Sequence, residues 1–157
     1  MRLLMIGTLF ILLLSACDTA VLSEAEWSME AQQWIVDDQK SFQLEATDTT
    51  TAYAMDITLN HQVTYPFQNL YIKTETIFPS GKVVASVTSI ELMNQGGTWE
   101  GNCSGKSCSI TLPLQQRFTF PEVGTYTWSV EHYMRTDTVQ GVNSFKVVCR
   151  KLEENAK

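Results

Sequence analysis

Apolar and polar residues alternate with a period of two along much of this chain, and this alternation limits the fold more than any other feature. From Tyr53 to Leu59 every second residue is apolar or aromatic, and a similar pattern returns in 70–78, 83–92 and 126–132. A period of two is typical of β-strands that bury one side and expose the other, as antiparallel strands do. The chain is therefore expected to fold mainly into antiparallel sheet.

Turn-forming residues separate these runs. Gly, Pro, Asn and Ser cluster at 79–82, 94–97 and 104–107, where turns are predicted. A Pro-x-x-Gly-x-Tyr segment at 121–126 resembles the tyrosine corner of immunoglobulin-like sandwiches. Because no long helical pattern interrupts the strands, we predict an all-β fold. It is an antiparallel β-sandwich, immunoglobulin-like or jelly-roll-like, of about eight strands.

The N-terminus has the organisation of an export signal. Met1 and Arg2 precede an apolar run, Leu3 to Leu14, which is too short to span a bilayer comfortably. Leu14-Ser15-Ala16-Cys17 resembles the bacterial lipobox, which implies cleavage before Cys17 and a diacylglycerol on its thiol; the alternative is an ordinary secreted protein. The predicted division is a signal peptide at 1–16, a lipidated N-terminus and tether at 17–28, a β-sandwich domain at 29–151 and a charged tail at 152–157.

The charge of the chain excludes some partners. The net charge is −6 and the isoelectric point about 4.8, whereas nucleic-acid-binding proteins are basic. The same negative charge argues against electrostatic adhesion to anionic lipid. We therefore expect no nucleic-acid partner, and expect the lipid on Cys17 to be the membrane contact.

Three cysteines remain after Cys17, in a compartment that permits disulfides. Cys103 and Cys108 flank a Gly-containing loop between two predicted strands, so we expect them to form a disulfide. A zinc site is the alternative, but it lacks a second Cys or His pair. Cys149 is in phase with Phe145 and Val147 and is interpreted as a small core residue. No metal or cofactor is expected.

The remaining candidates for chemistry are sparse. His61 and His132 continue the apolar phase of their strands, so we interpret them as core-edge residues rather than catalytic bases. Trp99, beside a Gly-Gly turn, and Tyr133 are the candidates for stacking on a sugar. Asp-Thr pairs place Thr19, Thr49 and Thr138 in predicted loops or the tether, in the pattern of O-glycosylation sites of exported Bacteroidetes proteins.

Five further segments share their order and spacing with a known family: Tyr65-Pro66-Phe67-Gln68-Asn69-Leu70-Tyr71-Ile72, Phe78-Pro79-Ser80-Gly81-Lys82-Val83, Gly97-Thr98-Trp99-Glu100-Gly101, Phe120-Pro121-Glu122-Val123-Gly124-Thr125-Tyr126 and Val139-Gln140-Gly141-Val142. Together with the lipobox they resemble the gliding-motility lipoprotein family GldH of the Bacteroidetes, over about residues 30 to 150. The chain departs from the family at Cys103 to Cys108, where a Gly-rich turn is expected.

The resemblance implies an envelope lipoprotein associated with the gliding and type IX secretion apparatus, with no catalytic residue to carry over. We therefore expect a non-enzymatic, acyl-anchored sandwich in the cell envelope, with the outer membrane favoured over the inner. It would dock on envelope proteins of that apparatus through an exposed apolar patch or an open sheet edge. The alternatives are a lipid-anchored carbohydrate-binding module and, least favoured, a hydrolase that uses His61 or His132.

Overall fold

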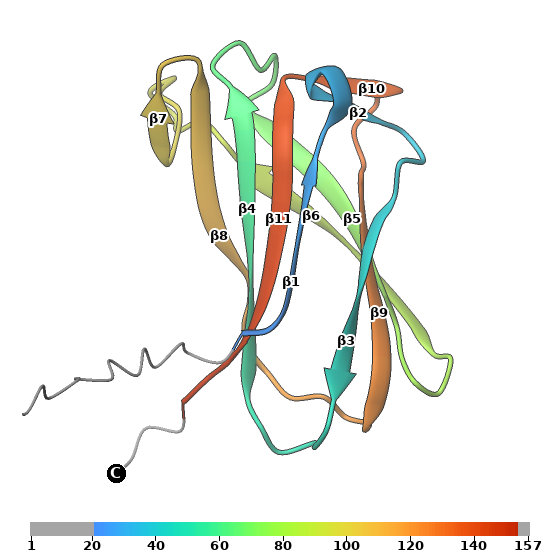
Figure 1. Cartoon of the computed structure of the whole chain (residues 1–157). Helices are drawn as coiled ribbons and strands as arrows, with labels where there is room; N and C mark the ends of the chain where they lie inside the picture. Colours follow the sequence, from blue (N-terminus) through green and yellow to red (C-terminus); the bar gives the residue numbers. More distant parts are fainter. Residues whose placement is uncertain (1–20, 154–157) are drawn as a thin grey trace, which may run out of the picture.

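The structure, a computed structural model, describes residues 21–153, in which two sheets pack face to face (Figure 1). Eleven strands run through these residues: β1 (Val21–Ser28), β2 (Gln33–Ile35), β3 (Lys40–Ala46), β4 (Tyr53–Gln62), β5 (Asn69–Ile77), β6 (Val83–Glu91), β7 (Asn102–Ser104), β8 (Ser107–Phe118), β9 (Gly124–His132), β10 (Thr138–Gln140) and β11 (Val142–Lys151). A short 3-10 helix, η1 (Glu30–Gln32), lies between β1 and β2. The prediction of an all-β antiparallel sandwich is confirmed.

The strand order brings distant parts of the chain together. One sheet has five strands in the order β1-β11-β4-β8-β7, and the other has four in the order β3-β9-β5-β6. A two-stranded ribbon of β10 and β2 lies at one end of the sandwich (Figure 1). All these pairings are antiparallel, and the predicted hairpin forms as β5 and β6, with Ile77 opposite Val83.

The core lies between the two sheets and is built by the predicted alternation. In β11 the side chains of Phe145, Val147 and Cys149 are buried, and the residues between them are not. Trp34, carried by the short strand β2, is fully buried and packs its ring 5.4 Å from that of Phe145. This contact fixes the short strand β2 to the core.

The predicted tether is wrong over most of its length. Residues 21–28 form β1, which pairs with β11 from Val21 opposite Arg150 to Ser28 opposite Ser144. These residues gain the backbone hydrogen bonds of an edge strand and bury part of Trp27, which a free tether would leave in water. The sandwich therefore includes residues 21–28, which the prediction placed in the tether. β3 and β10 are also strands absent from the prediction.

The two sides of the sandwich differ. On the closed side β1 lies against β3: the Ser23 hydroxyl donates to the Gln43 carbonyl at 3.1 Å, and the Trp27 and Phe42 rings lie 6.3 Å apart. On the open side β6 pairs with β5 only among the described residues, and β8 beyond Ser109 pairs with β4 only. No strand joins β6 to β8 in the part of the chain that the structure describes.

Candidate functional site

Several predicted sites lie outside the described residues. The signal peptide at 1–16, the lipidation site Cys17, Thr19 and most of the charged tail belong to this group, so they stay predictions. None of residues 21–153 forms a helix long and apolar enough to cross a membrane.

A disulfide joins Cys103 of β7 to Cys108 of β8, with the two Cα atoms 4.0 Å apart. The two residues are directly opposite in the β7–β8 ladder, which brings their side chains together on one face. Cys108 is buried and Cys103 is exposed. The bond links β7 to the N-terminal end of β8. Cys149 is free and buried in the core, and burial raises the pKa of its thiol to about 12.

The O-glycosylation candidates differ in their surroundings. Thr49 is exposed in the β3–β4 loop, where the Asp48 carboxylate accepts hydrogen bonds from the Thr50 and Thr51 amides at 2.8 and 2.6 Å. These bonds hold the pKa of Asp48 well below its usual range. Thr138 is half-buried in β10, opposite Ile35, so its predicted place in a loop is wrong. The strand forms because β2 supplies a pairing partner from a distant part of the sequence.

The five segments that carry the family resemblance come together at two corners of the fold. At the first corner the Tyr126 hydroxyl donates to the Glu122 carbonyl at 2.9 Å, as predicted for a tyrosine corner. The Glu122 carboxylate in turn accepts from the Ser80 amide and hydroxyl at 3.1 and 2.9 Å. A Cβ added to Gly124 would lie 3.1 Å from Pro79. The 78–83 and 120–126 segments therefore hold each other in place.

The second corner joins the other three segments. The Tyr65 hydroxyl donates to the Asn69 carbonyl at 3.1 Å, and the Tyr65 ring packs against that of Trp99 at 6.3 Å. A Cβ added to Gly141 would lie 3.2 Å from the Tyr65 Cα. These contacts give the 65–72, 97–101 and 139–142 segments a structural role.

Both histidines are buried, and they lie on strands of different sheets. His61 lies on β4 against the Trp99 ring at 4.7 Å, and His132 lies on β9 against the Trp34 ring at 6.0 Å. Burial lowers the pKa of each imidazole, which keeps it neutral at physiological pH. Their Nε2 atoms are buried without a hydrogen-bond partner in the structure. Among residues 21–153 no group of His, Cys, Asp and Glu side chains could hold a metal ion.

The two candidates for stacking on a sugar, Trp99 and Tyr133, differ in exposure. Trp99 is half-buried against His61 and Tyr65, so the expectation of an exposed sugar-stacking ring there is wrong. Gly96 and Gly97 of the turn are exposed, whereas the Trp99 ring packs against residues far away in the sequence, which the turn itself does not reveal. Tyr133 is 57% exposed, as that prediction requires.

Tyr133 belongs to an outer hollow of about 790 Å³ on the solvent face of the four-stranded sheet. Tyr71 of β5 lies beside it, since the Tyr133 amide donates to the Tyr71 carbonyl at 2.7 Å. The lining consists of Phe67, Tyr71, Val87, Tyr133, Met134, Arg135 and Thr136. Aromatic side chains, Met and Arg are the residues enriched at protein interfaces.

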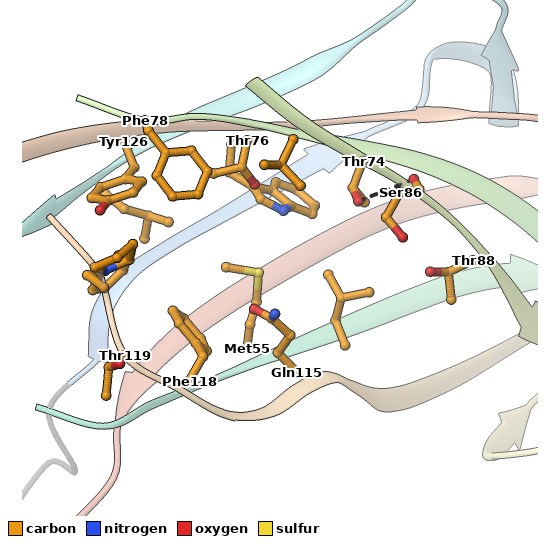
Figure 2. Close-up of a pocket in the computed structure, with 16 residues that line it drawn as sticks. Met55, Thr74, Thr76, Phe78, Ser86, Thr88, Gln115, Phe118, Thr119 and Tyr126 are labelled. Atoms are coloured by element: carbon orange, nitrogen blue, oxygen red, sulfur yellow. Dashed lines mark hydrogen bonds between the residues drawn. The ribbon is translucent and has the colours of Figure 1, made fainter. Parts of the chain in front are cut away.

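A second hollow, the inter-sheet cleft, opens on the open side and has a volume of about 350 Å³. Figure 2 shows side chains of the two sheets turned toward each other across it, with Thr76 and Phe78 opposite Met55 and Phe118. The cleft is lined by Leu44, Met55, Thr74, Thr76, Phe78, Val84, Ser86, Thr88, Leu114, Gln115, Phe118, Thr119, Phe120, Pro121, Tyr126 and Trp128. None of these is Asp, Glu, Lys, Arg or His. The cleft therefore favours uncharged occupants.

The fold defines an all-β sandwich domain with two hollows, one on the solvent face of the four-stranded sheet and one between the sheets. The family model described as GldH lipoprotein matches residues 21–147, so this chain belongs to the GldH lipoprotein family. The family inferred from five short segments is thereby confirmed.

Two relatives agree with this assignment. A protein of Christiangramia forsetii named gliding motility lipoprotein GldH homolog is 28% identical over 137 residues, which cover 87% of this chain and 83% of that protein. The gliding motility lipoprotein GldH of Flavobacterium johnsoniae is 29% identical over 91 residues, covering 58% of this chain and 57% of that protein. The solved structure of TmCBM61 with β-1,4-galactotriose covers 87% of this chain and 92% of its own at 8% identity, but its TM-score of 0.37 supports no inference.

Proposed function

We propose that this chain is an acyl-anchored, non-enzymatic envelope lipoprotein that docks on protein partners of the gliding and type IX secretion machinery. Membership of the GldH lipoprotein family and the names of the two relatives support the gliding assignment. The lipobox at Cys17 supports attachment to a membrane, for which we favour the outer membrane. The burial of both histidines and the uncharged cleft support a non-enzymatic role.

The observation that carries the docking role is the outer hollow. Tyr71, Val87 and Tyr133 are 43%, 50% and 57% exposed and lie together on one face. Contiguous exposed apolar groups on a soluble domain mark interaction sites. Tyr and Arg are also the residues that most often dominate binding energy at protein interfaces. We therefore place the partner contact on this face.

In-cell photocrosslinking tests the proposal. A crosslinking amino acid at Tyr133 of the full-length lipoprotein should capture gliding or secretion components, identified by mass spectrometry after membrane fractionation. The matched control is Thr111, exposed on the solvent face of the other sheet, which should capture none of them. Equal capture from both positions, or none from Tyr133, contradicts the docking surface. Cys17→Ala should move the protein out of the membrane fraction, and its retention there would contradict acyl anchoring.

Carbohydrate binding is the second candidate, and the pair of exposed rings at Tyr71 and Tyr133 favours it. Aromatic faces with neighbouring polar groups are suited to stacking on sugars, and Arg135 and Thr136 lie in the same hollow. Isothermal titration against a glycan panel separates the two functions. Heat of binding to a glycan that is lost in Tyr133→Ala would favour sugar binding. The absence of heat for every glycan would exclude sugar binding for that panel.

A further inference from the structure

Three of the four edges of the two main sheets carry a guard, meaning a feature that hinders pairing with another chain. An edge strand exposes unpaired backbone N–H and C=O groups, and proteins protect it with charges, proline, bulges, short length or a covering segment. β1 has Glu24, Glu26 and a shift in register near Val21. β7 is three residues long, and β8 beyond it carries Pro113 and Arg117.

The β3 edge is guarded by charge and by contact. Lys40 and Glu45 lie on this strand, and Ser23 of β1 donates a hydrogen bond to the Gln43 carbonyl. β1 therefore occupies the space in which another chain would have to approach β3.

The β6 edge has fewer of these guards, because its one charged residue, Glu91, is the last residue of the strand. It is nine residues long and pairs with β5 from Val83 to Glu91 without a break in register. The stretch 83–90 contains no charged residue and no proline. Val83, Val84 and Val87 are 52%, 44% and 50% exposed. Such a strand is a template for pairing with another extended chain.

The inter-sheet cleft lies directly beside this edge. Val84, Ser86 and Thr88 of β6 line it from one sheet, and Leu114 and Phe118 of β8 line it from the other. A strand added to β6 would continue the four-stranded sheet over the cleft, and every second side chain would point into it. In β-augmentation the backbone hydrogen bonds provide affinity and such pockets provide specificity.

The absence of charge defines the occupant. No lining residue of the cleft is ionised at neutral pH, so a charged side chain seated there would lose its hydration without gaining a partner. The uncharged stretch of β6 ends at Lys82 and Glu91. The complementary segment is therefore extended, uncharged over about eight residues and apolar at every second position.

We propose that the β6 edge and the inter-sheet cleft together accept an extended, uncharged strand from another envelope protein by β-augmentation. This inference deepens the proposed docking function and rests on it for the identity of the partner. The β6 strand of a second copy fits less well, because its cleft-side residues Val84, Ser86 and Thr88 are small and two of them are polar. A lipid acyl chain would enter the cleft without using the backbone of β6.

The test uses the full-length lipoprotein in lipid nanodiscs and a synthetic peptide with the core Thr-Leu-Thr-Val-Thr-Phe-Thr-Val between flanking lysines. Hydrogen exchange of the β6 amides should slow at least tenfold when the peptide is added, and that of the β3 amides should not change. Two control peptides carry N-methyl groups on one or the other alternate set of amides, and one of them should fail to bind. No protection of β6, or equal binding of both N-methylated peptides, would overturn the proposal, as would a dimer formed through β6.

Two lysine substitutions give a matched comparison. Val84→Lys places a charge on the cleft side of β6 and should weaken peptide binding at least tenfold, whereas Gln43→Lys on β3 should leave it unchanged. Ser86→Lys is the second cleft-side variant in case Val84→Lys does not fold. Unchanged binding to a folded cleft-side variant would contradict the proposal. Because the peptide assay needs no native partner, its result is separable from that of in-cell crosslinking.

Discussion

The two edges of the four-stranded sheet, β3 and β6, differ both in sequence and in what surrounds them. β3 buries Leu44 and Ala46 and packs against β1. β6, in contrast, exposes five consecutive residues from Val83 to Val87. The β3 edge contributes to the core, and the β6 edge projects past it. With the proposed docking at β6, stability and interaction would lie on opposite sides of the sandwich.

The largest expected effect separates the two edges by stability. Leu44→Ala should lower the free energy of unfolding by about 2–5 kcal/mol, because it removes a buried side chain and leaves a cavity. Val84→Ala should lower it by about 0.5 kcal/mol or less, because this residue is largely exposed. Urea denaturation measures both. Equal losses would show that β6 is part of the core and would remove the distinction between the edges.

The disulfide concerns a third edge. Replacing Cys103 and Cys108 by Ser should lower the free energy of unfolding by about 2 kcal/mol, because the unfolded chain regains the freedom of a short loop. The loss of β7 pairing should also speed amide exchange at Ser107 and Ser109 of β8. Unchanged exchange there would show that β7 covers this edge without the bond. Cys149 should stay unlabelled by thiol reagents in the folded protein, because it is buried.

A smaller effect tests the corner beside the cleft. Tyr126→Phe removes the hydroxyl that bonds to the Glu122 carbonyl and should cost about 1 kcal/mol of stability. Tyr133→Phe is the matched control, since this residue is 57% exposed and should change the unfolding midpoint little. If the two variants have equal midpoints, the corner hydrogen bond does not stabilise the fold.

The mildest expected effect is a gradual pH dependence that distinguishes the core from the β6 edge. Burial lowers the pKa of His61 and His132 below the ordinary value of 6.5. The unfolded chain therefore binds protons first, so stability is fully present above pH 6.5 and is lost as the pH falls toward the folded-state pKa values. The urea concentration at the unfolding midpoint should therefore decrease as the pH is lowered from about 7.5 to about 5.5. The decrease should be smaller in His61→Asn.

Peptide binding at β6 should stay constant over the same pH range. Neither 83–90 nor the cleft lining contains a histidine or a carboxylate. Fluorescence titration of the labelled peptide at several pH values, under conditions where the protein stays folded, checks this. Loss of binding that follows protonation of the histidines would link the cleft to the core.

Features that depend on neighbouring residues were predictable. The β5–β6 hairpin follows from two alternating runs and a Pro-Ser-Gly-Lys turn, and the tyrosine corner follows from a six-residue pattern. The pairing of Cys103 with Cys108 follows from a short loop between strands. In each case the contacts are local, so the order of strands in the sheets does not matter.

Features that depend on strand order were not predictable. The segment 21–28 is short and polar at alternate positions, and it becomes a strand because β11 offers it an edge. Trp99 is half-buried because a turn folds over His61 from another strand. The outer hollow is likewise assembled from β5, β6 and the segment after β9, so no single motif in the sequence predicts it.

By itself the sequence determined the all-β class, the apolar face of most strands, the family and the predicted lipid anchor, because periodicity and motifs are properties of contiguous residues. Only the tertiary structure decided which edges are covered and where the sheets separate. The uncharged stretch 83–90 is visible in the sequence, but an uncharged strand is equally suited to the middle of a sheet. Its place at an edge beside a cleft arises from long-range pairing, and that place turns an ordinary strand into a candidate docking site.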